Sequence, residues 1–170
     1  MPILDVRHLS IDYLADDGTR LHAVEDVSFS LEKGRSLALV GESGCGKTTT
    51  MLALLRLLPA DGRIVGGQIH YGGVDLLQLS EDQMRHYRWN NLAIVFQGAM
   101  NALNPVRKVG DQIAEALFLH RQLRGKLDRR AVRLRVGELM ELVGIAPERA
   151  QQYPHQFSGG MRPRAMIAMA

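Results

Sequence analysis

The chain contains very little cysteine and no long apolar stretch. Cys45 is the one cysteine among the 170 residues, so no disulfide can form within the chain, and we expect a reducing, cytosolic setting. No apolar run approaches the ~20 residues that a membrane-spanning helix needs. The first residues also lack the basic segment followed by an apolar segment that marks a secretory signal, so none is expected.

Lysine and aromatic residues are scarce as well. The chain has 4 Lys against 17 Arg, its aromatic content is 5%, and its formal net charge is +3. The positive excess is local, because seven basic residues and a single acid lie between Arg121 and Arg135. The simplest interpretation of this run is a solvated helix face, and the alternative is a surface for membrane headgroups or an acidic partner. No aromatic residue interrupts the run, which argues against a nucleic-acid surface.

Hydrophobic periodicity predicts strands in the first part of the chain. Residues 3–14 alternate loosely and residues 23–31 more strictly between apolar and polar side chains, with a turn predicted at residues 16–18. Two short apolar runs, residues 36–40 and 92–96, are typical of strands that are buried on both faces, as in a parallel sheet.

Helical patterns follow and then dominate. A helix is predicted over residues 48–58, whereas residues 62–77 return to a β pattern. Ser80, followed by two acidic residues, has the pattern of the N-cap of a short helix. Beyond Val109 the chain is predicted to be helical, with Gly144 ending one of its helices. The apolar residues that this helix places on one face are Val132, Val136, Leu139, Met140 and Val143.

A phosphate-binding loop is the most specific motif in the chain. Residues 41–48, GESGCGKT, match the pattern G-x-x-x-x-G-K-[ST] between a predicted strand and a predicted helix. Glycines let backbone N–H groups approach phosphate oxygens, and a helix N-terminus adds partial positive charge. Lys47 would supply a full charge to the β- and γ-phosphates, and Thr48 a hydroxyl to Mg²⁺. The residues predicted to bind nucleotide here are Gly41, Ser43, Gly44, Cys45, Gly46, Lys47, Thr48 and Thr49.

A phosphate loop alone is shared by kinases, GTPases, recombinase-like ATPases and ABC ATPases. A guanine-reading [NT]-K-x-D motif is absent, since the nearest string, at residues 125–128, lacks the first residue. The string FSGGM at residues 157–161 decides between the remaining classes. With it the chain resembles the ABC transporter ATPase family, whose signature loop has this form, and the resemblance covers essentially all 170 residues. The strings at residues 96–105 and 153–162 are most similar to the peptide-importer branch, which also handles nickel and glutathione.

The resemblance assigns roles to residues outside the phosphate loop. Tyr13 lies where the family places an aromatic residue that stacks on adenine. Gln97 matches the Q-loop glutamine, which would act in catalysis and, with Thr48, reach the Mg²⁺. The signature-loop residues that would contact the γ-phosphate held by a second ATPase subunit are Ser158, Gly159, Gly160 and Met161.

The resemblance also implies a fold class. We expect an α/β fold with a P-loop NTPase core, an N-terminal antiparallel β subdomain and an α-helical subdomain, truncated before the Walker B strand. Residues 1–170 would form an incomplete ABC ATPase domain, with residues 1–97 as the β-rich and P-loop core and residues 98–170 as the helical subdomain. The branch usually has Gln where this chain has Pro163, so with Ser158 as N-cap the signature helix is expected to be bent or frayed.

The expected function is that of the ATP-binding subunit of an ABC importer, which couples ATP binding and hydrolysis to the transport of peptides or related small solutes. Its cofactors would be ATP and Mg²⁺. Its partners would be permease transmembrane subunits, a second ATPase subunit and, indirectly, an extracytoplasmic solute-binding protein, at the cytoplasmic face of the cell membrane; no nucleic acid is expected. The sequence lacks the Walker B strand and the catalytic Glu, so this chain is predicted to be inactive alone. The alternatives are a non-hydrolysing nucleotide-binding fragment and a soluble ABC ATPase not tied to transport.

Overall fold

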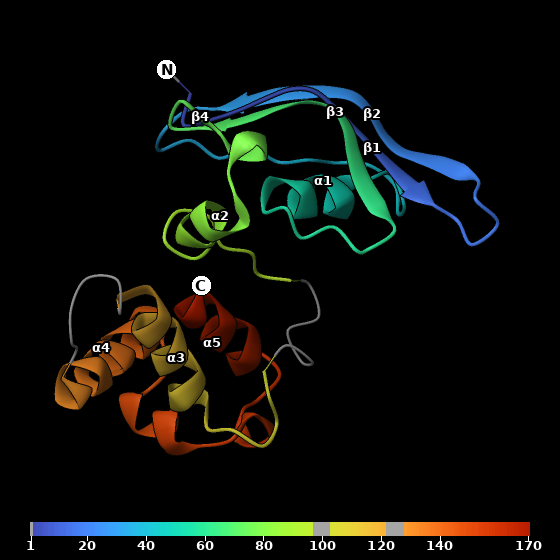
Figure 1. Ribbon diagram of the computed structural model, residues 1–170. Coiled ribbons are helices and arrows are strands. Elements are labelled where there is room, and N and C mark those ends of the chain that lie inside the picture. Colours follow the sequence, from blue (N-terminus) through green and yellow to red (C-terminus); the bar gives the residue numbers. More distant parts are fainter. Residues whose placement is uncertain (1, 97–102, 122–127) are drawn as a thin grey trace. The chain divides into compact units, whose positions relative to one another are not determined.

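The computed structural model describes residues 2–96, 103–121 and 128–170, and Gln97 lies outside these residues. The chain divides into two compact units, which we call the β unit (residues 1–85) and the helical unit (residues 86–170) (Figure 1). The sequence-based division after residue 97 stays a prediction. None of the described helices is long and apolar enough to cross a bilayer.

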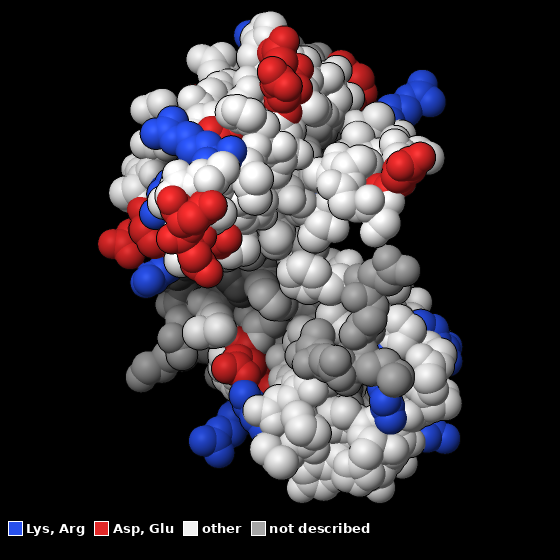
Figure 2. Space-filling model, turned by 90° about the vertical axis from the view of Figure 1, so that its right-hand side faces the viewer, with Lys and Arg blue, Asp and Glu red and all other residues white. Residues whose placement is uncertain are grey.

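Charge is distributed unevenly between the two units. The β unit contains 8 Lys and Arg against 12 Asp and Glu, and the helical unit contains 13 against 6. The formal charges of the two units are therefore −4 and +7, which add to the +3 of the whole chain. On the face that Figure 2 draws, side chains of both signs are scattered among larger uncharged areas.

The β unit is built on a four-stranded antiparallel sheet with the order β2-β1-β3-β4. The strands are β1 (Leu4–Leu14), β2 (Arg20–Leu31), β3 (Gly62–Tyr71) and β4 (Val74–Asp75). They confirm the strands predicted at residues 3–14 and 23–31 and the β pattern predicted at residues 62–77. Helix α1 (Lys47–Leu54) lies beneath one face of the sheet (Figure 1). The buried apolar residues of this layer include Val6, Leu9, Ile11, Val24, Ala53, Leu54 and Ile69.

The predicted turn between β1 and β2 is confirmed. Gly18 has a φ of 81°, and its N–H donates to the Ala15 carbonyl at 2.9 Å. The Thr19 backbone amide donates to the Asp17 carboxylate at 2.8 Å. This hydrogen bond, with a smaller contribution from the Thr19 hydroxyl, lowers the pKa of Asp17 from its ordinary value.

A kink crosses the middle of the sheet. His8 and Asp26, on neighbouring strands, both have positive φ, at 50° and 49°, and the register shifts around them. The backbone amides of both residues donate to serine hydroxyls on the neighbouring strand. His8 donates to Ser28 at 2.8 Å, and Asp26 donates to Ser10 at 3.0 Å. On β3, Gly67 has a φ of 97°, and a Cβ there would lie 2.6 Å from the carbonyl oxygens of Arg7 and His8. The kink thus depends on glycine in the third strand.

The prediction of strands at the two short apolar runs, residues 36–40 and 92–96, is wrong. Residues 36–40 form no strand, and Leu37 and Val40 are 46% and 92% exposed. In residues 92–96 the one β interaction is an isolated bridge between Leu92 and Arg88. A strand of a parallel sheet exists only when neighbouring strands satisfy its backbone groups. In the described part of the chain no strand lies against either segment.

Helix α1 ends at Leu54, four residues earlier than predicted. Arg56 takes the left-handed conformation with a φ of 52°, and the Leu57 amide donates back to the Leu52 carbonyl at 2.9 Å. This is the backbone pattern of a Schellman motif, with Arg56 where glycine is usual. The Arg56 guanidinium donates to the carbonyls of Leu76 and Leu79, at 3.3 and 2.5 Å, and so joins the helix end to the segment after the sheet.

That segment contains η1 (Leu76–Gln78) and α2 (Glu81–Tyr87). The predicted N-cap at Ser80 is confirmed, because its hydroxyl accepts from the Gln83 amide at 3.3 Å. The Gln83 side chain accepts from the Ser80 amide at 2.8 Å, which completes a capping box.

The helical unit contains α3 (Val109–Arg121), α4 (Arg129–Leu142), η4 (Pro147–Gln151), η5 (Pro154–Gln156) and α5 (Met161–Met169). The predicted apolar face of α4 is confirmed: Val132, Val136 and Met140 are buried, and Leu139 and Val143 pack against the same core. Gly144, with a φ of 68°, ends α4 as predicted. Its amide and that of Ile145 donate to the carbonyls of Glu141 and Met140.

We predict that Gly67→Ala lowers the free energy of unfolding of the β unit by about 2–3 kcal/mol, because the methyl group collides with two carbonyl oxygens and φ is positive. Its neighbour Gly66 is the matched control, since a Cβ there would meet no atom closer than 3.8 Å. Urea unfolding followed by circular dichroism compares the two. Equal losses in the two variants contradict the prediction.

Candidate nucleotide-binding site

The phosphate loop connects residues 36–40 to α1, and its shape requires glycine at particular positions. Gly44 and Gly46 both have a φ of 85°. A Cβ on Gly46 would lie 2.6 Å from the Ala23 carbonyl oxygen on β2, and a Cβ on Gly41 would lie 2.6 Å from the Cys45 sulfur. The loop is therefore closely packed against itself and against β2, and the glycines make this approach possible.

The Lys47 ammonium lies inside this loop. Its Nζ donates to the carbonyl oxygens of Gly41 and Glu42, at 2.8 and 2.5 Å, and lies 3.2 Å from the Cys45 sulfur. Helix α1 begins at Lys47 with no side-chain cap and no acidic residue in its first turn. The first amides of a helix have no intrahelical acceptor and carry partial positive charge. Ammonium and amides together form a site whose charge and donors fit a phosphate chain.

The next residues of α1 connect the loop to Tyr13. The Thr48 side chain is exposed, so its hydroxyl is accessible to a cation. Thr50 is buried, and its hydroxyl donates to the Gly46 carbonyl at 2.9 Å. Between them, Thr49 accepts a long hydrogen bond, 3.5 Å, from the half-buried Tyr13 hydroxyl on β1. The structure thus brings Tyr13 and the phosphate loop together within the β unit.

The signature-loop residues lie in the helical unit, at the start of α5. Ser158, Gly159 and Gly160 are exposed, and a Cβ on either glycine would meet no atom within 4 Å. The N-cap of α5 is Gly160, and no side chain caps the helix. The predicted N-cap role of Ser158 is therefore wrong. Its backbone carbonyl, not its hydroxyl, accepts from the amides of Met161 and Arg162.

Pro163 lies near the start of α5, and the expected bending or fraying of this helix stays a prediction. Because α5 begins at Met161, Pro163 is its third residue, in the turn whose N–H groups have no intrahelical acceptor. The Arg162 amide donates to the Ser158 carbonyl, which lies before the helix, whereas Pro163 has no N–H to donate to the next carbonyl, that of Gly159. From Met161 to Met169, α5 is one continuous helix.

Known proteins resemble this chain over almost its whole length. The family model described as ABC transporter matches residues 24–170. The chain belongs to the ABC transporter family. Among curated proteins, it is 44% identical to the dipeptide transport ATP-binding protein DppD and 45% identical to the oligopeptide transport ATP-binding protein OppD, both of Bacillus subtilis. Each match covers 99% of this chain but 50% and 46% of the relative, so the chain spans about half their length.

A solved ABC structure has the same fold. It is a dimeric ATP-binding cassette in a post-hydrolysis state bound to ADP and Pi, with a TM-score of 0.83 and 22% identity. The match covers 98% of this chain and 68% of that chain. The predicted family and fold class are thereby confirmed, and the curated relatives bear out the predicted peptide-importer branch.

Two arginines that sequence reasoning missed hold the signature loop of this ABC chain. Arg164 donates from Nε to the Gly160 carbonyl and from Nη1 to the carbonyls of Val143 and Gly144, at 3.2, 3.2 and 2.8 Å. Arg162 donates to the Pro154 carbonyl at 3.1 Å. Arg164 thus joins the start of α5 to the end of α4, where a positive charge also interacts favourably with the helix dipole. The sequence shows the arginines, but no local pattern indicates which carbonyls they meet.

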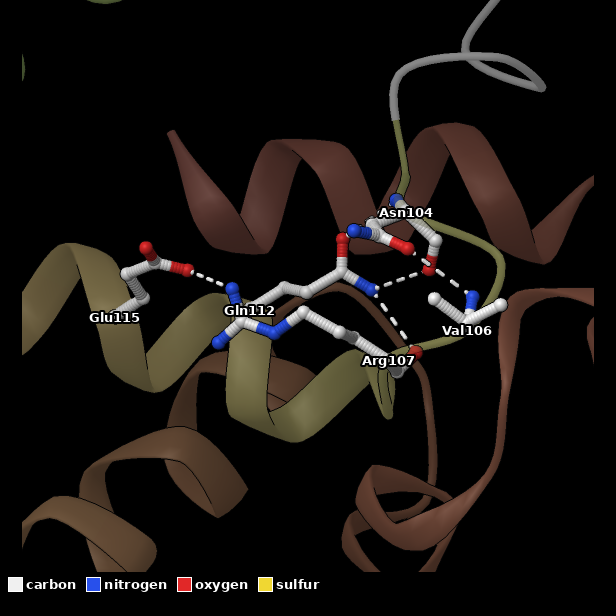
Figure 3. A network of polar contacts seen from close by, with 5 residues as sticks. All are labelled: Asn104, Val106, Arg107, Gln112 and Glu115. Atoms are coloured by element: carbon white, nitrogen blue, oxygen red, sulfur yellow. Dashed lines mark hydrogen bonds and ion pairs between the residues drawn. The ribbon is translucent and has the colours of Figure 1, made fainter.

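Gln112 is a second residue that sequence reasoning missed. It is 7% exposed, and Figure 3 shows its side chain among the loop that precedes α3. Its Oε1 accepts from the Asn104 amide at 2.8 Å, and its Nε2 donates to the carbonyls of Asn104 and Arg107 at 3.0 and 3.1 Å. The Arg107 guanidinium pairs with Glu115 on α3. One buried amide therefore fixes this loop to α3.

We predict that Gln112→Ala lowers the free energy of unfolding of the helical unit by about 2–4 kcal/mol, because three loop hydrogen bonds lose their partner in a buried place. Glu115→Gln is the control, and it should cost less than about 1 kcal/mol because its ion pair with Arg107 is half exposed. Guanidinium unfolding measures both values. A larger cost for Glu115→Gln than for Gln112→Ala contradicts the assignment.

We also predict that the exposed Cys45 thiol reacts readily with maleimide and that Mg-ATP protects it. The reason is its place in the phosphate loop, 3.2 Å from the Lys47 ammonium. Mass spectrometry follows the labelling rate with Mg-ATP and with adenosine as the control. Equal rates under the two conditions place Cys45 away from bound phosphate and contradict the prediction.

Proposed function

We propose that this chain provides the ATP-binding part of an ABC importer ATPase, and that residues 41–48 bind the phosphates of ATP together with Mg²⁺. The observation that carries the proposal is the Lys47 ammonium, held by two loop carbonyls at the uncapped start of α1. An ammonium, a set of amide donors and a helix dipole that converge on one place stabilise a polyanion.

The residues of the site would act on different parts of the bound nucleotide. Backbone amides of the loop and of the start of α1 would donate hydrogen bonds to phosphate oxygens: those of Ser43, Gly44, Cys45, Gly46, Lys47, Thr48 and Thr49. Gly41 has no side chain and so leaves space for the Cys45 sulfur. Tyr13 presents its ring to the adenine, a contact that depends on stacking more than on hydrogen bonds. Mg²⁺, when bound with ATP, neutralises phosphate charge, and Thr48 and Gln97 would hold it.

The signature loop would serve a second subunit. We propose that Ser158, Gly159, Gly160 and Met161 meet the γ-phosphate of a nucleotide held by the phosphate loop of another ATPase subunit. The open, uncapped start of α5 supports this role, since Ser158, Gly159 and Gly160 are exposed and no side chain caps the helix. One chain would therefore contribute to two nucleotide sites.

The coupling to transport rests on the relatives. DppD and OppD are described as transport ATP-binding proteins for dipeptides and oligopeptides. We infer that this chain acts at the cytoplasmic face of the cell membrane with permease subunits and, indirectly, a solute-binding protein, to import peptides or related solutes.

Hydrolysis needs a carboxylate near Mg²⁺ and a group that orients the attacking water. Neither Thr48 nor Gln97 is a general base at neutral pH, so the 170 residues alone are expected to bind ATP without turnover at a family-like rate.

We predict that Lys47→Ala weakens Mg-ATP binding by about 30-fold or more, because charge-assisted hydrogen bonds to phosphate contribute about 2–3 kcal/mol. Lys33→Ala is the matched control, since Lys33 is an exposed lysine of the same unit outside the phosphate loop. Isothermal calorimetry measures both affinities, and circular dichroism checks that both variants fold. Unchanged ATP affinity in folded Lys47→Ala overturns the assignment of the phosphate loop.

A further inference from the structure

The first turns of α4 carry a basic cluster that the proposed nucleotide chemistry does not use. Arg129, Arg130 and Arg133 are exposed, and Leu134 is 63% exposed beside them. The opposite face of the same helix holds Val132, Val136 and Met140 in the core, so the orientation of the helix is fixed. The cluster of Arg129, Arg130, Arg133 and Leu134, which we call the α4 patch, therefore points to solvent in this structure.

The arginines of the α4 patch have no ionic partner within the described residues. By contrast, Arg135 pairs with Glu138 on the same helix at 2.8 Å, and Arg107 pairs with Glu115. The acids on the exposed side of α4, Glu138 and Glu141, lie toward its C-terminal end. The first turn contains no acid beyond the N-cap Asp128, whose side chain accepts from the Arg130 amide.

Stability of the helix does not account for this arrangement. Positive side chains near a helix N-terminus interact unfavourably with the helix dipole, which favours acids there. Leu134 likewise gains nothing from an exposed position. A partner with a negatively charged surface above an apolar layer explains both features. It would attract the arginines near the helix N-terminus and cover the exposed leucine beside them.

We propose that the α4 patch binds the surface of a bilayer that contains anionic phospholipid. Guanidinium groups form paired hydrogen bonds with phosphate esters, and a leucine beside them can enter the boundary between headgroups and acyl chains. The net charge of +7 in the helical unit attracts the same surface at longer range. Nucleic acid is less favoured because the patch contains no aromatic residue to stack on bases. This inference is independent of nucleotide binding and assigns a lipid contact to the chain itself.

The test is vesicle flotation with the whole chain, because floating vesicles separate bound protein from aggregates, which sink. The vesicles contain phosphatidylcholine alone or phosphatidylcholine mixed with phosphatidylglycerol, at about 0.15 M salt. The triple variant Arg129→Gln, Arg130→Gln, Arg133→Gln removes the charges of the patch. The matched control Arg20→Gln, Lys33→Gln, Arg35→Gln removes the same charge from exposed positions of the β unit.

We expect the unmodified chain to float with the anionic vesicles and not with the neutral ones. Each arginine should contribute about fivefold to the partition coefficient, so the patch variant should lose about a hundredfold and the control variant less than about fivefold. Leu134→Gln should lower partition severalfold without changing its dependence on salt. Mg-ATP binding that stays intact in the patch variant shows that the variant is folded and separates this inference from the proposed function.

Three results would overturn the proposal. Equal losses in the patch variant and the control variant would show attraction by net charge alone. Equal flotation with neutral and anionic vesicles would show that headgroup charge is not recognised. Tighter binding of the chain to a single-stranded oligonucleotide or to polyglutamate than to the anionic vesicles, at the same salt, would assign the patch to another class of partner.

Discussion

The candidate site depends on the close approach between Gly46 and strand β2. Gly46 takes a left-handed conformation, and any side chain there would lie within 3 Å of the Ala23 carbonyl. The same residue is the N-cap of α1, and its carbonyl accepts hydrogen bonds from both the amide and the hydroxyl of Thr50. The position of Gly46 therefore fixes the direction of the first amides of α1 and the point from which the Lys47 side chain projects. The rest of the nucleotide site follows from this one contact.

The two candidate phosphate sites use the same physical arrangement on different supports. Both consist of a glycine-containing loop followed by a helix whose first turn has neither a side-chain cap nor an acid. The phosphate loop is supported by the sheet and is filled by a lysine. The signature loop has no such lysine, and arginines behind it hold its backbone instead. A phosphate bound between two such loops would receive a full charge from one side and amide dipoles from both.

Local patterns in the sequence predicted those elements whose stability is local. The turn at Gly18, the cap at Ser80 and the end of α4 at Gly144 were predictable because each needs only a few neighbouring residues. The phosphate loop was predictable because its glycines and Lys47 stand at fixed spacings. Residues 36–40 and 92–96 were not, since an apolar run indicates a buried strand but does not supply the neighbouring strands. The roles of Gln112 and Arg164 depend on carbonyls 4 to 21 residues away, which no spacing rule identifies.

Backbone amide NMR during a nucleotide titration tests whether the amides of the phosphate loop donate hydrogen bonds to the phosphates of ATP. We expect Mg-ATP to shift the amide resonances of Gly44, Gly46, Lys47 and Thr48, and adenosine, which has no phosphate, to leave them in place. Adenosine should instead perturb residues near Tyr13. If saturating Mg-ATP shifts no resonance between Gly41 and Thr48 while the chain remains folded, the phosphate loop does not bind the phosphates of ATP.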